Sequence, residues 1–117
     1  RHSVLYAAAG AMVTVVDLSP AMLALDRAVA AERQLPVRVV ETSMDDLSMF
    51  LPGEFDVVVQ PVSSCYIPDI APLYREVARV LSVDGLYISQ HKQPASLQTA
   101  VEPNAAGKYE LNEPYYR

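Results

Sequence analysis

Cysteine is nearly absent from this chain of 117 residues, since Cys65 is the only one. A single thiol cannot form a disulfide within the chain. With only two histidines, His2 and His91, the usual ligand sets of a structural metal ion are also missing, so we expect no metal site. Glycine is scarce too: there are four, and none has the spacing of the glycine fingerprint found in nucleotide-binding loops.

Excess positive charge and long apolar runs are missing as well. The chain has 9 lysines and arginines against 14 aspartates and glutamates, and its basic residues are scattered. Nucleic-acid backbones and anionic membrane surfaces require a basic stripe, so we expect neither as a partner. No apolar run approaches the roughly 18 to 20 residues of a membrane span. The N-terminus also lacks the plan of a signal peptide, and a cytoplasmic location is the expectation.

The composition that is present, 51% hydrophobic and 20% charged, is typical of one small globular domain. The chain opens on Arg1 with a run that has the spacing of a helix body, and no capping residue precedes it. We therefore expect a piece of a longer protein.

Strand-like and helix-like segments alternate along the chain. The apolar, β-branched segments expected as buried strands are residues 12–16, 37–41, 55–59 and 86–90. Helices are expected before Gly10, from Pro20 behind the cap Ser19, and behind the cap Asp69. Such alternation predicts an α/β fold with a parallel sheet and right-handed crossovers. Between the second and third strands we expect a polar connection with at most one helical turn.

Two of these helices have apolar residues at helical spacing. The side chains expected on their buried faces are Val4, Leu5 and Ala8 in the first helix and Ile70, Leu73, Tyr74, Val77 and Leu81 in the third. Asp84 and Gly85 are expected to turn the chain into the last strand.

The residues that follow the strands carry most of the functional weight, because ligands of such sheets bind beyond the carboxyl ends of the strands. These residues are Asp17–Leu18, Ser43–Asp46, Gln60–Tyr66 and His91–Lys92. A carboxylate such as that of Asp17 can accept hydrogen bonds from both hydroxyls of a ribose. It can also simply cap the turn into the next helix, and the residues leave both roles open.

Four segments, taken in order, resemble the class I S-adenosylmethionine-dependent methyltransferases of Rossmann-like fold: VTVVDLSPAML, VRVVETSMDDL, FDVVV and LYREVARVLSVDGLYIS. The resemblance covers about residues 1–92, expected as the core of a cofactor-binding domain. Residues 93–117 are expected as a loop or the start of a substrate-side insertion. The resemblance implies a doubly wound, mainly parallel sheet, S-adenosylmethionine as cofactor, and methyl transfer to an acceptor. The acidic balance favours a small-molecule acceptor over nucleic acid.

The resemblance also implies roles for individual residues. Asp17 would accept the ribose hydroxyls, and Leu18 would contact the adenine face. Gln60 and Pro61 would lie beside the methionine part of the cofactor.

Ser43 and Met44 match the place where the family holds the adenine ring by an acidic side chain and a backbone N–H. This chain has Ser43 where aspartate is usual. Asp45 is the alternative for that contact, although its neighbour Asp46 indicates a solvated pair.

The family's glycine-rich loop and first strand precede the helix that residues 1–10 resemble. In the family's strand order, that first strand pairs with the strands expected at residues 12–16 and 55–59. We therefore expect an incomplete sheet that lacks its first and its C-terminal strands. Two unpaired edges are unfavourable, so the gap should make the chain unstable or be filled by another segment or chain, a homo-oligomer included.

Methyl transfer from a sulfonium needs little acid–base chemistry, which explains why no catalytic triad is visible. For a hydroxyl or thiol acceptor, His91 is the candidate base, and an ordinary loop residue is the alternative. Tyr66 either stacks on the acceptor or covers the core, and Cys65 is expected as a loop filler. A nicotinamide-dependent oxidoreductase and a non-catalytic partner protein of the same fold are the rival functions.

Overall fold

The chain alternates helices and strands in the order expected for an α/β fold. The computed structural model describes residues 2–111. Its elements are α1 (His2–Ala8), β1 (Val13–Asp17), α2 (Pro20–Glu32), β2 (Val37–Glu41), β3 (Phe55–Pro61), the 3-10 helix η1 (Ser64–Tyr66), α3 (Ile70–Val80), β4 (Leu81–Gln90) and α4 (Pro94–Gln98). The strand predicted at residues 37–41 is confirmed at both ends.

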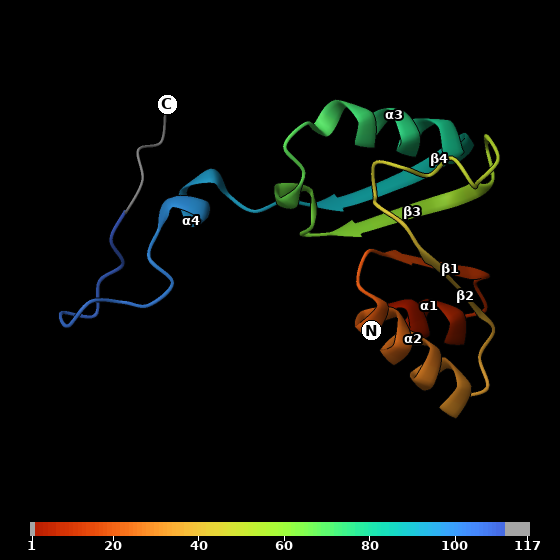
Figure 1. Ribbon diagram of the computed structural model, residues 1–117, viewed down its shortest axis with the longest axis horizontal. Helices are drawn as coiled ribbons and strands as arrows, with labels where there is room; N and C mark the ends of the chain where they lie inside the picture. Colours follow the sequence, from red (N-terminus) through yellow and green to blue (C-terminus); the bar gives the residue numbers. More distant parts are fainter. Residues whose placement is uncertain (1, 112–117) are drawn as a thin grey trace.

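The four strands form two parallel pairs. β1 lies beside β2 in register from Val13↔Val37 to Asp17↔Glu41, and β3 lies beside β4. Within residues 2–111 no strand ladder joins β1 to β3, and the two pairs are separate sheets (Figure 1). The predicted parallel pairing is confirmed. The separation falls between the two strands where the sequence predicts a gap.

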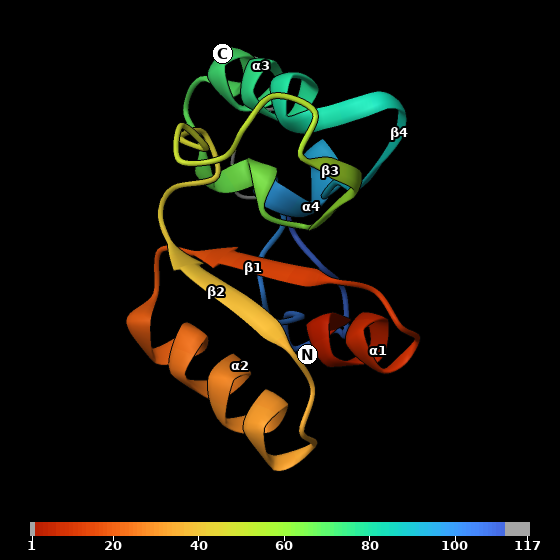
Figure 2. The same cartoon turned by 90° about the vertical axis from the view of Figure 1, so that its right-hand side faces the viewer.

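Helices cover the strands on opposite sides. α3 lies on one side of the molecule, and α1 and α2 lie on the other (Figure 1). α2 packs across both β1 and β2, whereas α3 contacts β4 (Figure 2). This is the two-sided covering of a doubly wound fold. Among the described residues, no helix combines the length and the apolar character needed to cross a bilayer.

Side-chain caps start the two longer helices, as predicted. The Ser19 hydroxyl accepts the backbone N–H of Met22 at 3.4 Å, and Pro20 occupies the first turn of α2, where its missing N–H costs nothing. The Asp69 carboxylate accepts the N–H of Ala71 at 3.0 Å and begins α3. Local chemistry therefore sets where both helices begin.

Some predicted faces and boundaries are wrong. In α1 the buried residues are Val4 and Ala7, whereas Leu5 is 62% exposed, because this short helix packs against both β1 and α2. Met12 is exposed, and β1 begins one residue later. Leu81 is the C-cap residue of α3 and opens β4, so it lies just beyond the helical residues.

In place of the turn expected at Asp84–Gly85, β4 is continuous and has an irregularity in its pairing there. The register with β3 passes from Phe55↔Leu81 directly to Val57↔Leu86. Asp84 has φ 63°, and a Cβ on Gly85 would lie 2.8 Å from the carbonyl oxygen of Ser82. Glycine is required here because the backbone folds back on itself.

Residues 42–54 connect the two sheets and hold part of the core. These residues form turns and contain no helix, which fits the expectation of at most one helical turn. Leu47 and Phe50 from this segment and Val80 from α3 are buried together. Four partly buried side chains of β1, β2 and β3 pack against them: Val16, Val40, Phe55 and Val58. The expected polar connection therefore also packs the core between the two sheets.

Beyond β4 the chain leaves the body of the molecule (Figure 1). The short helix α4 was not predicted. After it, residues 99–111 fold back on themselves, with an isolated antiparallel bridge between Thr99 and Leu111 and a hydrogen bond of 2.8 Å from Ala100 N–H to the Glu110 carbonyl. The last six residues of the predicted segment 93–117 lie outside the described residues.

Candidate functional site

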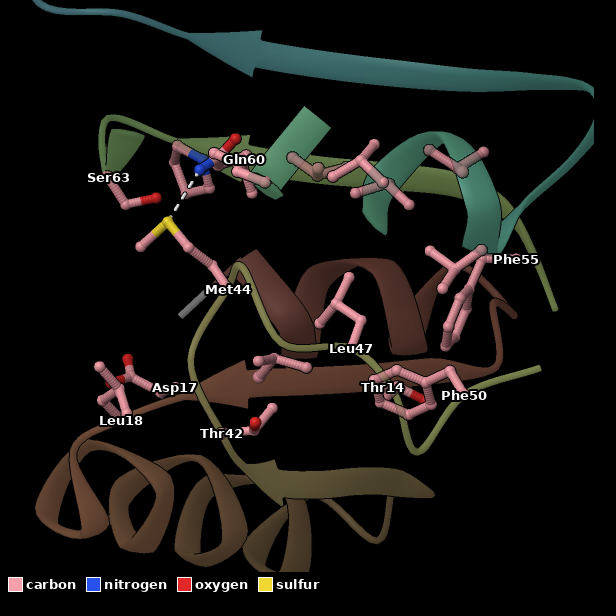
Figure 3. Close-up of a pocket in the computed structure, with 18 of the residues that line it drawn as sticks. Thr14, Asp17, Leu18, Thr42, Met44, Leu47, Phe50, Phe55, Gln60 and Ser63 are labelled. Carbon is pink, nitrogen blue, oxygen red and sulfur yellow. Dashed lines mark hydrogen bonds between the residues drawn. The ribbon is translucent and has the colours of Figure 1, made fainter. Parts of the chain in front are cut away.

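A cavity of about 580 Å³ lies between β1 and β3. Figure 3 shows that its two ends differ. Asp17, Leu18, Met44, Gln60 and Ser63 gather at the end where the strands finish, whereas Phe50 and Phe55 lie at the opposite end. The charged Asp17 and the polar Gln60 and Ser63 therefore lie at the carboxyl ends of the strands, as expected for a ligand site of a parallel α/β fold, whereas Thr14 lies near Phe50.

Asp17 caps its own turn and also lines the cavity. Its Oδ1 accepts the backbone N–H of Ser19 at 2.8 Å, which fixes the carboxylate just before α2. A carboxylate offers about four lone-pair positions, so one N–H leaves acceptor capacity for a ligand. The capping role is observed, and the ribose contact stays a prediction that this geometry allows.

Leu18 lies beside Asp17 on the cavity wall and is 64% exposed. Thr42, the first residue after β2, also lines the cavity, and its hydroxyl donates to the carbonyl oxygen of Asp46 at 2.9 Å. Thr42 was missed, although its place directly after a predicted strand was a usable signal.

Ser43 and its acidic neighbours belong to the turn that follows β2. The Ser43 hydroxyl donates to the Asp45 carboxylate, and the residues lining the cavity include neither of them. The Ser48 hydroxyl and backbone N–H donate to Asp46 and lower the pKa of its carboxyl. Met44, between Ser43 and Asp45 in the sequence, does line the cavity. The adenine contact predicted for this stretch therefore has Met44 at the cavity, while Ser43 and Asp45 bond to each other.

Gln60 and Pro61 line the cavity at the end of β3. Gln60 is buried, with 8% of its surface exposed. Its amide nitrogen donates to the sulfur of Met44 at 3.0 Å, and its carbonyl oxygen accepts the Tyr87 hydroxyl. Tyr87 was missed as a member of the site because it is 27 residues away and lies within a strand.

His91 is hydrogen-bonded at both ring nitrogens. Nδ1 lies 3.0 Å from the Ser64 hydroxyl, and Nε2 lies 2.7 Å from the Ser89 hydroxyl. The ring thus ties the end of β4 to η1, and His91 is not among the residues that line the cavity. To act as a base, the ring would have to break its hydrogen bond to one of these two serine hydroxyls. Tyr66 does line the cavity and is 78% exposed, so it does not cover the core, and stacking on an acceptor stays a prediction.

An ion pair on α3 holds the connecting segment that carries Met44. The Arg79 guanidinium donates to the carbonyl oxygens of Leu47 and Phe50, each at 2.8 Å, and to Glu76 at 2.7 Å. Glu76 in turn accepts the N–H of Leu47 at 2.9 Å. The Arg79 side chain is the main cause that lowers the pKa of Glu76. The contacts with Leu47 and Phe50 span 29 to 32 residues, so no local pattern could have indicated them.

The model of a family described as methyltransferase domain matches residues 1–89. The chain belongs to this methyltransferase family. The expected family assignment is thereby confirmed.

The curated relatives of this family member are longer than the chain. The uncharacterized methyltransferase YbaJ of Bacillus subtilis is 39% identical over 111 residues, which cover 93% of this chain and 44% of YbaJ. A ubiquinone biosynthesis O-methyltransferase of Xanthomonas campestris pv. campestris is 32% identical over 94 residues, which cover 79% of this chain and 39% of that enzyme. The chain therefore spans less than half the length of these relatives.

Solved structures agree with the family. The PH0226 protein of Pyrococcus horikoshii superposes with a TM-score of 0.77 at 25% identity, covering 91% of this chain and 53% of its own. An S-adenosylmethionine-dependent methyltransferase from Mesorhizobium loti gives a TM-score of 0.61 at 28% identity, covering 84% of this chain and 45% of its own. The predicted Rossmann-like α/β fold is confirmed.

Proposed function

We propose that this chain forms the cofactor-binding part of an S-adenosylmethionine-dependent methyltransferase that acts on a small-molecule acceptor. One observation carries the proposal. The Asp17 carboxylate at the end of β1 and the buried Gln60 amide at the end of β3 line one cavity at the carboxyl ends of the strands. The family match supports the type of reaction.

The residues around this end of the cavity suit the cofactor. Asp17 offers acceptors for sugar hydroxyls, Leu18 and Met44 offer apolar surface for a flat base, and Gln60 offers an amide for the amino-acid end. Asp17 is also the one charged side chain among the described lining residues, and its negative charge suits a cationic sulfonium.

The rest of the cavity has a different character. It runs between the edges of β1 and β3, where Val16, Val57 and Val59 line it. Those edges have no ladder partner other than β2 and β4 among the described residues, and the space matches the gap predicted for a further strand. We therefore assign the ligand only to the end that Asp17 and Gln60 line.

When bound, S-adenosylmethionine supplies a methyl group on a positively charged sulfur that leaves as a neutral thioether. The protein residues mainly bind, orient and exclude water. Asp17 fixes the sugar, and the valines of β1 and β3 keep water from the buried side of the site. Ser63 and Tyr66, which follow β3, also line the cavity, and we assign them to the acceptor side. His91 stays the candidate base for an acceptor that must lose a proton.

Isothermal titration of the full-length protein with S-adenosylhomocysteine tests the proposal. Asp17→Asn should weaken binding about 10- to 100-fold, because hydrogen bonds to a charged group are worth roughly 1.5 to 3 kcal/mol. Asparagine is itself a good capping residue, so the turn before α2 should persist. Ser19→Ala is the matched control, since it removes a helix cap beside the site but no cavity-lining group.

Equal affinities for wild type and Asp17→Asn would overturn the assigned role of Asp17. A wild-type protein that gives no heat with S-adenosylhomocysteine would favour the non-catalytic partner. Heat with reduced nicotinamide dinucleotide instead would favour the oxidoreductase.

A further inference from the structure

The contacts around Gln60 indicate how the site selects one end of its ligand. We propose that Tyr87 is a positioning residue: its hydroxyl fixes the Gln60 amide so that the NH₂ group faces the cavity and donates to the carboxylate of the cofactor's amino-acid end. This inference rests on the proposed function, because it takes S-adenosylmethionine as the ligand.

Gln60 is held between two partners of different chemistry. Its carbonyl oxygen accepts the hydroxyl of Tyr87, which lies on the neighbouring strand β4. Its amide nitrogen lies 3.0 Å from the sulfur of Met44, at the end of the cavity where the strands finish (Figure 3). With 8% of its surface exposed, Gln60 has little access to water, so these partners decide its orientation.

Only one orientation of the amide satisfies both partners. A thioether sulfur can accept a hydrogen bond but cannot donate one, whereas a phenol can donate. A flipped amide would turn its carbonyl oxygen toward the lone pairs of Met44, where no donor is present. Tyr87 and Met44 together therefore favour the NH₂ group on the cavity side.

Tyr87 is suited to remain a donor. Its ring packs edge-on against Tyr74, with ring centroids 6.2 Å apart. Burial, and secondarily the nearby Tyr74, raises the pKa of the Tyr87 hydroxyl above its ordinary value. The phenol therefore keeps its proton across the neutral range, and the Gln60 carbonyl keeps its donor.

Met44 is a weak partner for a buried amide nitrogen, because thioether sulfur accepts hydrogen bonds poorly. A carboxylate oxygen is a much stronger acceptor. A ligand that brings a carboxylate to this point would give the amide a better partner than Met44. A ligand group that can only donate would meet another donor.

Two ligands and one pair of variants test this positioning role in the full-length protein. S-adenosylhomocysteine carries the amino-acid end, and 5′-methylthioadenosine has the same nucleoside and sulfur without it. Tyr87→Phe should weaken S-adenosylhomocysteine about fivefold, the equivalent of one ordinary hydrogen bond. It should leave 5′-methylthioadenosine within about twofold. Tyr74→Phe, which removes the hydroxyl from the ring packed against Tyr87, should change neither affinity by more than about twofold.

A double-mutant cycle shows whether Tyr87 acts through Gln60. Gln60→Leu should also weaken S-adenosylhomocysteine selectively, and adding Tyr87→Phe to it should cause no further loss. Gln60→Glu, which presents an oxygen to the ligand carboxylate, should weaken S-adenosylhomocysteine more than Tyr87→Phe does. Thermal unfolding of each variant checks that it is folded.

The failures are distinguishable. If Tyr87→Phe weakens both ligands equally, or adds its full effect to Gln60→Leu, Tyr87 has only a structural role and the inference is wrong. If Gln60→Glu binds as tightly as wild type, the ligand presents no carboxylate there, and the inference is wrong as well. If wild type binds neither ligand, the proposed function fails with it.

Discussion

The two halves of the molecule have the same plan but end differently. In the amino-terminal half, defined as α1, β1, α2 and β2, a capped helix joins two parallel strands. In the carboxyl-terminal half, defined as β3, η1, α3 and β4, a second capped helix does the same. Yet β1 ends on a carboxylate, Asp17, whereas β3 ends on a buried amide, Gln60.

In the proposed function, this difference divides the recognition chemistry between two halves that share a scaffold plan. One half offers an acceptor for hydroxyl groups, and the other offers a donor that Tyr87 orients. Neither half alone encloses the cavity, whose lining comes from both. A ligand that needs both groups can therefore bind only when the two halves are held in one arrangement.

The segment 42–54, together with α3, holds that arrangement. Phe50 packs edge-on against Phe55, with ring centroids 5.1 Å apart. The guanidinium carbon of Arg38 lies 5.0 Å from the centroid of the Phe50 ring. Arg79 binds two backbone carbonyls of the same segment. The comparison between the halves can therefore be tested by loosening this connection.

The largest effect is expected from Phe50→Ala, which removes a ring that is 2% exposed and touches both halves. Loss of a buried phenylalanine typically lowers the free energy of unfolding by about 3 to 5 kcal/mol. Met49→Ala, at an exposed neighbouring position, should change it by less than about 1 kcal/mol. Chemical denaturation followed by circular dichroism measures both variants.

The shape of the transition is as informative as its midpoint. If residues 42–54 couple the halves, wild type should unfold in one cooperative transition. Two separate transitions in wild type, or a Phe50→Ala protein as stable as wild type, would mean that each half is stable without the connection.

A smaller effect is expected from Glu76→Gln, and it should depend on pH. The hydrogen bond from Arg79 is the main cause that lowers the pKa of Glu76, with the Leu47 N–H assisting and burial opposing. A carboxyl whose pKa is lowered by folding stabilises the protein above its unfolded pKa, and the contribution is lost as pH falls through the folded value.

Glu76→Gln should therefore lower the free energy of unfolding at pH 7 by about 1 kcal/mol, the value of an ordinary hydrogen bond. The difference from wild type should shrink between about pH 5 and pH 3, where carboxyls become protonated. Denaturation at several pH values measures this, with Glu102→Gln in the exposed loop as the control. A difference that stays constant with pH would contradict the assigned role of the Glu76 carboxylate.

Local signals explain what the sequence predicted correctly. Ser19 and Asp69 cap helices through atoms two or three residues away, and residues 37–41 alternate within a β-branched run, so short windows contain the needed information. The same holds for Asp17, whose place at a strand end indicated the site.

Long-range contacts explain what the sequence missed. The turns of residues 42–54 depend on Arg79 and Glu76, and the orientation of Gln60 depends on Tyr87. These partners lie 27 to 32 residues away, and their side chains meet only after the strands pair. The exposure of Leu5 is a further case, because the buried face of α1 is chosen by neighbours that come later in the chain.

Hydrogen exchange with and without S-adenosylhomocysteine tests most directly whether one ligand joins the two halves. We predict that the ligand slows amide exchange in the full-length protein at residues 17–20, at residues 42–46 and at residues 60–66 together, over one concentration range. Protection confined to one half, or to the segment after β4, would contradict the account.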